Sequence, residues 1–213
     1  MKLLAIITAR GGSKRLPKKN VLNLNGKPLI AWTIEAALRC PLIDKTVLSS
    51  DDQEIIKIAK YYGCDVPFKR DRSLAEDNSS SVDVIIDALE KVPGYDWIVL
   101  LQPTSPRRSS LDIQNAIEFC LKMNANSCVS VTKVAHKPEL FYHIGEGSKI
   151  LKVSSKEELF RVNGAIYISK ISEFLSQKSL ITDNTVAYIM PPERSIDIDT
   201  KLDFEIASRS FIV

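Results

Sequence analysis

Two patterns alternate along the first part of this chain, and their order restricts the possible fold more than any other feature. The strand-like runs are residues 3–7, 45–49, 65–68, 96–101 and 127–131. The helical patterns are residues 28–38, 53–62, 80–90 and 109–123. Leu3–Ile7 is apolar throughout, which is typical of a strand covered on both faces. Strands alternating with helices predict an α/β fold with three layers, in which a mostly parallel sheet lies between helices.

The regular alternation breaks between residues 132 and 161. This stretch is polar and contains Pro138, Gly145 and Gly147, so we expect an inserted hairpin arm. Strand-like runs at 164–169 and 187–190 and a helical pattern at 201–209 follow. With 213 residues, 45% of them hydrophobic, the chain is long enough to bury one core. We therefore expect a single domain over residues 1–213, with the arm at 132–161.

Composition and charge exclude several classes of protein. The formal net charge is +3 without a basic tract, which argues against a dedicated nucleic-acid binder. The sequence contains no run of about 18 apolar residues, so we expect no membrane span. The short apolar N-terminus runs into Arg10 without a signal-peptidase cleavage site. No CxxC pair occurs, so reduced thiols in a cytoplasmic protein are expected at Cys40, Cys64, Cys120 and Cys128.

A basic, glycine-containing loop, Ala9–Asn20, follows the first predicted strand. Gly11 and Gly12 let backbone N–H groups approach anionic oxygens. A solvated basic turn would show the same charge, but the position directly after a strand favours a ligand site. The loop matches neither the P-loop nor the GxGxxG pattern. Five cationic side chains suit a triphosphate: Arg10, Lys14, Arg15, Lys18 and Lys19.

Two aspartates near the C-terminus, Asp197 and Asp199, are two positions apart. In an extended segment both carboxylates face the same side and can reach one cation. Mg²⁺ prefers oxygen ligands and often bridges carboxylates to substrate phosphates, so this pair predicts a magnesium site. The alternative is that the pair caps the closing helix.

Two further segments carry polar groups beside predicted strands. In Leu100–Arg108, the side chains of Gln102, Thr104 and Ser105 suit a polyhydroxylated ligand, although a rigid loop with a helix cap is the alternative. In Phe160–Ile168, Arg161 can pair with a carboxylate, and Asn163 and Tyr167 are polar. The Asn163–Gly164 dipeptide is also typical of a simple turn.

Taken together, the segments ARGGSKRLPKKN, LLQPTSP, NGAIYI and SIDID resemble the CMP-N-acylneuraminate synthetases, a family of cytidylyltransferases, in their order and at similar spacing. The resemblance covers nearly the whole chain. It implies a Rossmann-like domain and a homodimer whose dimerisation arm is the segment 132–161. It also implies Mg²⁺-dependent coupling of CTP to the anomeric hydroxyl of a nine-carbon sugar acid, such as N-acetylneuraminic or legionaminic acid. The resemblance further implies that pyrophosphate is released and that the product serves lipopolysaccharide or capsule synthesis.

The resemblance also implies roles for individual residues. Arg10, Lys19 and Asp199 are the expected catalytic residues. The nucleotide-binding residues are Arg10, Gly11, Gly12, Ser13, Lys14, Lys19 and Asn20, with Arg70, Asp77 and Ser81 around cytosine and ribose. The sugar-binding residues are Gln102, Thr104, Ser105, Asn163 and Tyr167, with Arg161 near the acid's carboxylate. Asp197 and Asp199 are the implied metal ligands.

Two alternatives stay open at this point. Arg15-Leu16-Pro17 is similar to the synthetases for the eight-carbon sugar acid Kdo, so another sugar acid is one alternative. A non-catalytic nucleotide-binding module on the same fold is the other. The paired aspartates argue against the second alternative, because nucleotide binding alone does not require a cation site.

Overall fold

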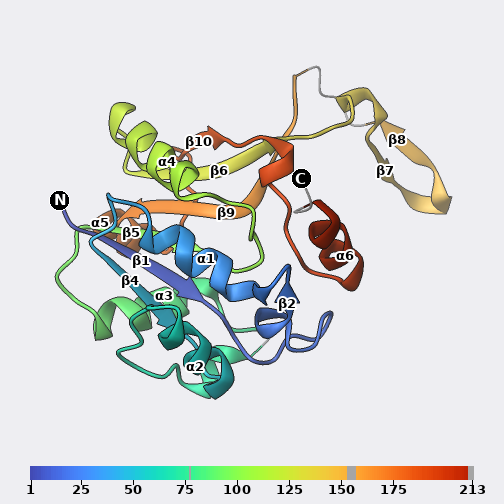
Figure 1. Ribbon diagram of the computed structural model, residues 1–213. Helices are drawn as coiled ribbons and strands as arrows, with labels where there is room; N and C mark the ends of the chain where they lie inside the picture. The colour runs from blue at the N-terminus through green and yellow to red at the C-terminus, as the bar shows by residue number, and fades with distance from the viewer. Residues whose placement is uncertain (77, 153–156, 211–213) are drawn as a thin grey trace.

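A computed structural model describes residues 1–76, 78–152 and 157–210 of the chain. A six-stranded sheet forms its centre, in the order β10–β6–β9–β5–β1–β4 (Figure 1). The strands span Leu3–Thr8 (β1), Lys45–Ser49 (β4), Trp97–Leu101 (β5), Ser127–Lys133 (β6), Phe160–Lys170 (β9) and Val186–Ile189 (β10). β1 runs parallel to β4 and β5, and β10 runs parallel to β6. The expected mostly parallel sheet is confirmed.

One long strand, β9, runs antiparallel to both of its neighbours, β5 and β6. Its register against β6 shifts between Val129 and Val131. Gly164 lies within β9 with φ +74°, a conformation that favours glycine. The strand therefore bends where it passes the carboxyl end of β5.

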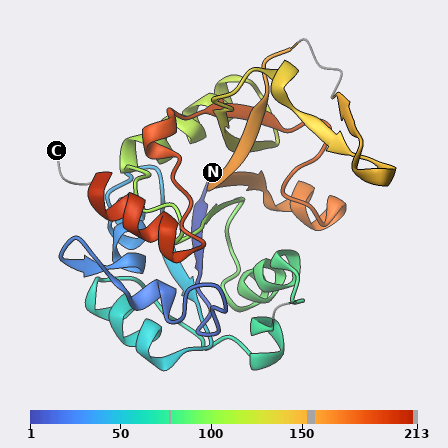
Figure 2. The ribbon, with the colours of Figure 1, turned by 90° about the vertical axis from the view of Figure 1, so that its right-hand side faces the viewer.

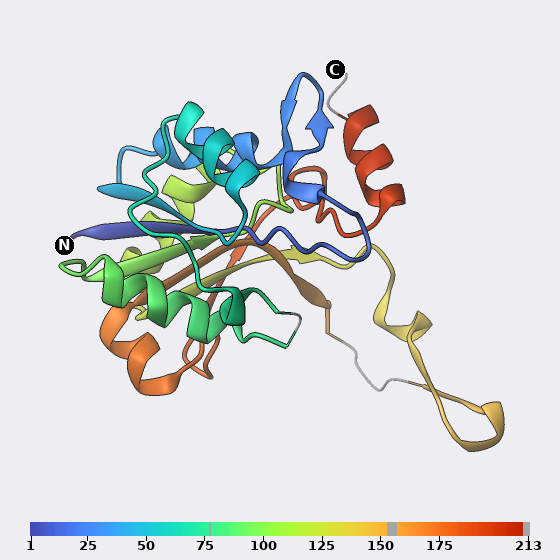
Figure 3. The same ribbon diagram turned by 90° about the horizontal axis from the view of Figure 1, so that it is seen from below.

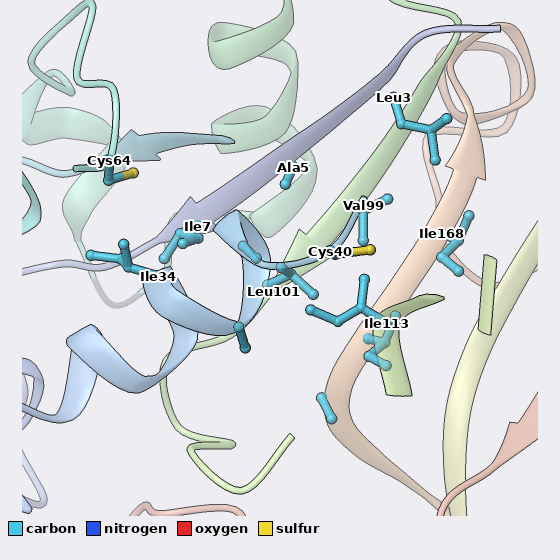
Figure 4. Close-up of a cluster of buried hydrophobic side chains, with 14 of the residues drawn as sticks. Leu3, Ala5, Ile7, Ile34, Cys40, Cys64, Val99, Leu101, Ile113 and Ile168 are labelled. Carbon is cyan, nitrogen blue, oxygen red and sulfur yellow. The ribbon is translucent and has the colours of Figure 1, made fainter. Parts of the chain in front are cut away.

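Alternate residues of β1 pack into two different hydrophobic clusters. Leu3, Ala5 and Ile7 face the helices α1 (Leu29–Leu38), α2 (Gln53–Tyr61) and α4 (Ser110–Lys122) (Figure 4). Leu4 and Ile6 face α3 (Ser81–Lys91) and α5 (Ile171–Gln177). Figure 3 shows α1 and α2 on one side of the sheet and α3 and α5 on the other. The predicted three-layer arrangement is confirmed. It forms because successive side chains of a strand point to opposite faces of the sheet, and both faces of β1 are apolar.

Helix starts follow local capping chemistry. Asp52 accepts hydrogen bonds from the N–H groups of Glu54 and Ile55 at the start of α2. Ser109 and Asp112 form a complete capping box at the start of α4. These caps begin the helices directly after the loops that follow β4 and β5.

Four features differ from the sequence prediction. Residues 65–68 do not form a strand, and only a single parallel bridge links Asp65 to Val47. Pro28 precedes α1 instead of opening it. The helix α5 and the small hairpin of β2 (Asn23–Leu24) and β3 (Lys27–Pro28) were not predicted. Each is short and depends on tertiary partners more than on its own pattern.

The C-terminal helix α6 (Lys201–Ser210) lies beside the β2–β3 hairpin (Figure 2). Ala207 of α6 is buried in a third cluster with Leu24 and Ile198. This packing brings the segment before α6, which carries the paired aspartates, against the N-terminal part of the chain.

The irregular stretch expected at 132–161 contains an antiparallel hairpin, β7 (Tyr142–Ile144) and β8 (Ile150–Lys152), that projects from the body of the molecule (Figure 3). β6 continues to Lys133 and β9 begins at Phe160, so the arm is shorter than expected. Its role in dimerisation stays a prediction. All four cysteines are buried and free. Within the described residues, every helix is too short or too polar to cross a membrane.

Candidate active site

A cavity of about 560 Å³ opens at the carboxyl ends of β1 and β5. Thr8 is the last residue of β1, and Gln102 directly follows β5. This edge of a parallel sheet is where α/β proteins bind ligands. The cavity is lined by Thr8, Arg10, Ser13, Lys14, Arg15, Lys19, Asn20, Gln102, Pro103, Thr104, Asp197 and Asp199. Three of the four sequence segments therefore meet around one space.

A second cavity, of about 290 Å³, shares Thr8 and Arg10 with the first. Its other lining residues are Arg70, Leu74, Glu76, Ser79, Ser81 and Val84. Small-molecule sites usually occupy about 300–1,000 Å³. The two adjoining cavities together therefore have room for two small molecules side by side, such as a nucleotide and a second substrate.

The glycine loop is held in place by the segment that follows β4. The N–H of Gly11 donates to Asp51 Oδ1 over 3.1 Å, and a Cβ at Gly11 would lie 2.7 Å from Asp52 Oδ2. Only glycine therefore fits at position 11. Buried Asn20 donates from Nδ2 to the Arg10 carbonyl and ties the two ends of the loop together. At Gly12, by contrast, a Cβ would meet no atom of the described residues within 4 Å.

The cations of this loop have different partners. Lys19 donates from Nζ to Asp199 Oδ1 over 3.0 Å and to the Ile198 carbonyl over 2.9 Å. Arg15 donates from Nη2 to the other oxygen of Asp199, Oδ2, over 2.8 Å. Lys18 turns away and pairs with Glu54 on α2. Ion pairs and a hydrogen bond therefore link the N-terminal loop directly to the C-terminal aspartate segment.

Asp197 has the least satisfied carboxylate in the cavity wall. Within the described part of the chain, its buried Oδ1 has no hydrogen-bond partner. Burial raises the pKa of Asp197 and nearby Asp199 raises it further, while Thr104 and Lys19 oppose the shift. A buried oxygen without a partner, beside a second carboxylate, fits a cation.

The alternative reading of the aspartate pair as a helix cap is wrong. Thr200 and Asp203 cap α6: the N–H of Asp203 donates to Thr200 Oγ1, and that of Thr200 to Asp203 Oδ2. No group of three or more His, Cys, Asp and Glu side chains with metal-binding geometry occurs among the described residues. A cation at Asp197 and Asp199 would therefore complete its shell with water and substrate oxygens, as Mg²⁺ commonly does.

Gly164 is a site residue that sequence reasoning missed. A Cβ at this position would lie 2.8 Å from Gln102 Oε1 and 3.7 Å from Asp197 Oδ2. Its absence leaves room for the Gln102 side chain against β9. The strand-like run at 164–169 begins with this glycine, whereas the observed strand starts at Phe160, so Gly164 lies in its interior, where a glycine marks a bulge or a close approach.

Ser105 and Asn163 support the site from inside the protein. Both are fully buried. Asn163 donates from Nδ2 to Ser195 Oγ over 2.9 Å and accepts from Ser130 Oγ over 2.6 Å. Ser105 Oγ donates to the Asn163 carbonyl over 3.4 Å. The amide of Asn163 thus holds β9 against the segment that carries Asp197, and its contact with a sugar stays a prediction.

The other predicted sugar-binding residues lie around Asp197. Arg161 donates from Nη2 to the Ser195 carbonyl over 3.1 Å, and its charge opposes the rise that burial causes in the pKa of Asp197. Tyr167 is half-buried, and burial together with Asp197 raises its pKa. Thr104 accepts from the N–H of Ile198 through its carbonyl oxygen. These contacts bring the sugar-binding prediction and the metal prediction to the same place.

Arg70 and Ser81 both line the second cavity. Arg70 is buried and donates from Nε to Ser49 Oγ over 2.9 Å. Burial lowers its pKa to about 10, so its guanidinium remains charged at neutral pH. Asp77, the third residue expected around cytosine and ribose, lies outside the described residues.

Three supporting residues were not anticipated. Arg108 donates from Nη1 to the carbonyls of Gln102 and Ala165, and burial lowers its pKa to about 9. Arg194 forms a two-pronged ion pair with buried Asp112. In the sequence, Arg108 and Arg194 look like ordinary surface charges and Asp112 looks like part of a helix cap. No local pattern therefore identifies them as supports of the site.

Comparison with known proteins identifies relatives over nearly the whole chain. A CMP-N,N'-diacetyllegionaminic acid synthase from Legionella pneumophila is 36% identical, over 98% of this chain and 96% of that protein. An N-acylneuraminate cytidylyltransferase from Escherichia coli O18:K1:H7 is 37% identical, over 97% of this chain and 51% of that longer protein.

The fold also matches a solved structure. CMP:2-keto-3-deoxy-manno-octonic acid synthetase complexed with CTP superposes with a TM-score of 0.74 at 18% identity, over 99% of this chain and 98% of that one. At this identity the match shows a shared fold. The family model described as Cytidylyltransferase matches residues 4–206. The chain therefore belongs to the cytidylyltransferase family.

Proposed function

We propose that this protein transfers CMP from CTP to the anomeric hydroxyl of a nine-carbon, sialic-acid-type sugar acid and releases pyrophosphate. The observation that carries the proposal is the pairing of Lys19 with Asp199, beside Asp197, in the wall of a cavity that a basic glycine loop also lines. A triphosphate needs the cations, and a transfer reaction at phosphorus benefits from the carboxylates as a cation site.

The chain's own residues supply positioning and charge for this reaction. Arg10, Lys14 and Lys19 line the cavity and would neutralise charge that develops on the phosphates and on the pyrophosphate leaving group. Gly11 and Asn20 hold the loop in one conformation, so these charges are placed before substrate binds.

Asp197 and Asp199 would hold Mg²⁺, because Asp197 has a buried oxygen with no partner among residues 1–76, 78–152 and 157–210, and Asp199 lies two residues away in the same cavity wall. When bound, the ion supplies charge neutralisation on phosphate oxygens and polarises an attacking hydroxyl. Arg15 and Lys19, which bond to Asp199, limit the charge on this pair of carboxylates.

The sugar would lie toward β9, where Gln102, Tyr167 and Arg161 surround Asp197. Arg161 offers a guanidinium for the sugar's carboxylate. The nine-carbon class is favoured over the eight-carbon sugar because the relatives at 36% and 37% identity are named for nine-carbon acids. The eight-carbon synthetase is similar only in fold, at 18% identity.

The projecting arm would form a homodimer contact. Its hairpin exposes large apolar side chains, including Ile144 (73% exposed) and Ile150 (65% exposed). Clustered exposed apolar residues mark interaction sites in soluble proteins. A second copy of the chain is the proposed partner.

Incubation with CTP, Mg²⁺ and a panel of sugar acids tests the function. The panel contains N-acetylneuraminic, legionaminic, pseudaminic and Kdo acids, and pyrophosphate and the CMP-sugar are both measured. We expect products with at least one nine-carbon acid, and formation of these products at a rate about 10²–10³ times lower in the Asp199→Asn variant. Products only with Kdo would select the eight-carbon alternative, and CTP binding without any product would select the non-catalytic module.

A further inference from the structure

Both carboxylate oxygens of Asp199 accept hydrogen bonds from cationic side chains. Lys19 Nζ lies 3.0 Å from Oδ1, and Arg15 Nη2 lies 2.8 Å from Oδ2. The neighbouring Asp197 instead keeps a buried oxygen, Oδ1, for which the described residues offer no hydrogen-bond partner. A divalent cation at this pair would find one carboxylate available and the other already neutralised.

The two cations are held very differently. The Lys19 side chain is only 12% exposed and also donates to the Ile198 carbonyl. The Arg15 side chain is 69% exposed, and an exposed ion pair of this kind contributes little net free energy. Lys19 is therefore a fixed part of the cavity wall, whereas Arg15 can exchange its partner at low cost.

A competing partner for Arg15 belongs in the same cavity. Arg15 lines it together with Arg10 and Lys14, the cations expected to meet phosphate. A guanidinium bonds to phosphate oxygens through parallel N–H groups, a geometry that a triphosphate offers repeatedly. A bound triphosphate therefore competes directly with Asp199 for Arg15.

We propose that Arg15 is an exchangeable counter-ion: it bonds to Asp199 until a nucleotide triphosphate binds, then transfers to phosphate and leaves Asp199 Oδ2 for a divalent cation. The proposal rests on the proposed function for its ligand. Binding of nucleotide and binding of metal are then coupled through one side chain, and by linkage each favours the other. Arg15 is a positioning residue in this scheme, because it acts through Asp199.

Metal binding to the purified protein in the absence of nucleotide tests the first half of the proposal. Mn²⁺ serves as the probe, and free Mn²⁺ is measured by electron paramagnetic resonance. In Arg15→Gln we expect affinity for Mn²⁺ to rise by about three- to tenfold at low salt, because a positive neighbour of the carboxylates is removed. Arg15→Lys keeps the charge and should stay close to the wild type.

Lys18→Gln is the matched control. Lys18 lies in the same loop and its replacement removes the same charge, but its partner is Glu54, not Asp199. An equal rise in Mn²⁺ affinity in Arg15→Gln and Lys18→Gln would show that the loss of any positive charge from the loop has this effect. That result would overturn the proposal. Mn²⁺ binding that survives Asp197→Asn and Asp199→Asn would place the metal elsewhere and would also overturn it.

Nucleotide binding without metal tests the transfer to phosphate. CTP is titrated in the presence of EDTA, and heat is measured. We expect Arg15→Gln to bind CTP about three- to tenfold more weakly than the wild type and Lys18→Gln, at low salt. Unchanged CTP affinity would overturn the exchange. Neither measurement involves a sugar or turnover, so the exchange can fail while the proposed reaction stands, and the reverse.

Discussion

Arg194 donates to both carboxylate oxygens of Asp112, from Nε over 3.0 and 3.1 Å and from Nη2 over 3.0 Å. The pair joins the start of α4 to the segment that leads to Asp197. Arg194→Ala would remove this ion pair from the buried carboxylate of Asp112. We expect a loss of about 2–3 kcal/mol in the free energy of unfolding, measured in urea. Lys201→Ala, which breaks an exposed pair with Glu205, should cost less than about 0.5 kcal/mol; equal losses would contradict the argument.

Lys19→Ala and Asp199→Asn should be folded and nearly inactive. Each removes a charged group that is already positioned in the cavity, and the loss of one such group typically lowers the rate by about 10²–10³. The measurement is the initial rate of pyrophosphate release, with circular dichroism to establish folding. Lys45→Ala, a lysine that pairs with Asp65, serves as control and should keep its rate. Near-normal turnover in either site variant would exclude the assigned roles.

Gly164→Ala should weaken sugar binding more than nucleotide binding. The added Cβ would lie 2.8 Å from Gln102 Oε1 and displace that side chain. We expect KM for the sugar acid to rise by about tenfold while KM for CTP changes little. Gly94→Ala provides the matched control, since Gly94 also has positive φ but a Cβ there would meet nothing within 4 Å. Both variants should lose about 1–2 kcal/mol of stability from backbone strain, and only the first should lose sugar affinity.

The ionised form of Asp197 should cost stability in metal-free buffer. Burial raises its pKa in the folded protein above the unfolded value, so the folded state favours the protonated carboxyl. Stability from this group is present at low pH and is lost as pH rises through the raised pKa. Urea unfolding in EDTA should therefore find Asp197→Asn more stable than the wild type at pH 7, with a smaller difference near pH 4.

Added Mg²⁺ provides the control for this experiment. It should stabilise the wild type and have little effect on Asp197→Asn, because a ligand that binds only the folded state raises its stability. A stability difference that does not depend on pH would contradict the role given to burial.

Ile144→Lys should convert a dimer into a monomer. Ile144 is exposed at the projecting hairpin, where the proposed dimer contact lies. Light scattering coupled to size-exclusion chromatography measures the mass in solution. Tyr61→Lys changes an even more exposed aromatic residue on α2 and should leave the mass unchanged. A monomeric wild type, or a dimer that survives Ile144→Lys, would place any contact elsewhere.

Features carried by short-range pattern could be predicted from the sequence. Leu3–Ile7 is apolar throughout, and it is a central strand with alternate residues in two clusters. The loop Ala9–Asn20 and the residues Gln102 and Thr104 were expected at strand ends, and they line one cavity. Hydrophobic periodicity, helix caps and loops at strand ends depend on neighbouring residues in the sequence. They can therefore be predicted without knowing which distant residues come into contact.

Other features depend on residues far apart in the chain. The antiparallel direction of β9, the place of Gly164 against Gln102 and the inward-facing amide of Asn163 follow from sheet order. The α/β class, the basic loop and the aspartate pair can be recognised from the amino-acid sequence alone. Tertiary packing brings Arg15 and Lys19 to Asp199 and, within the part of the chain that the structure describes, leaves one oxygen of Asp197 without a hydrogen-bond partner. These pairings depend on how the whole sheet packs against its helices. They cannot be predicted from the local propensity of each segment, because the partners are far apart in the sequence.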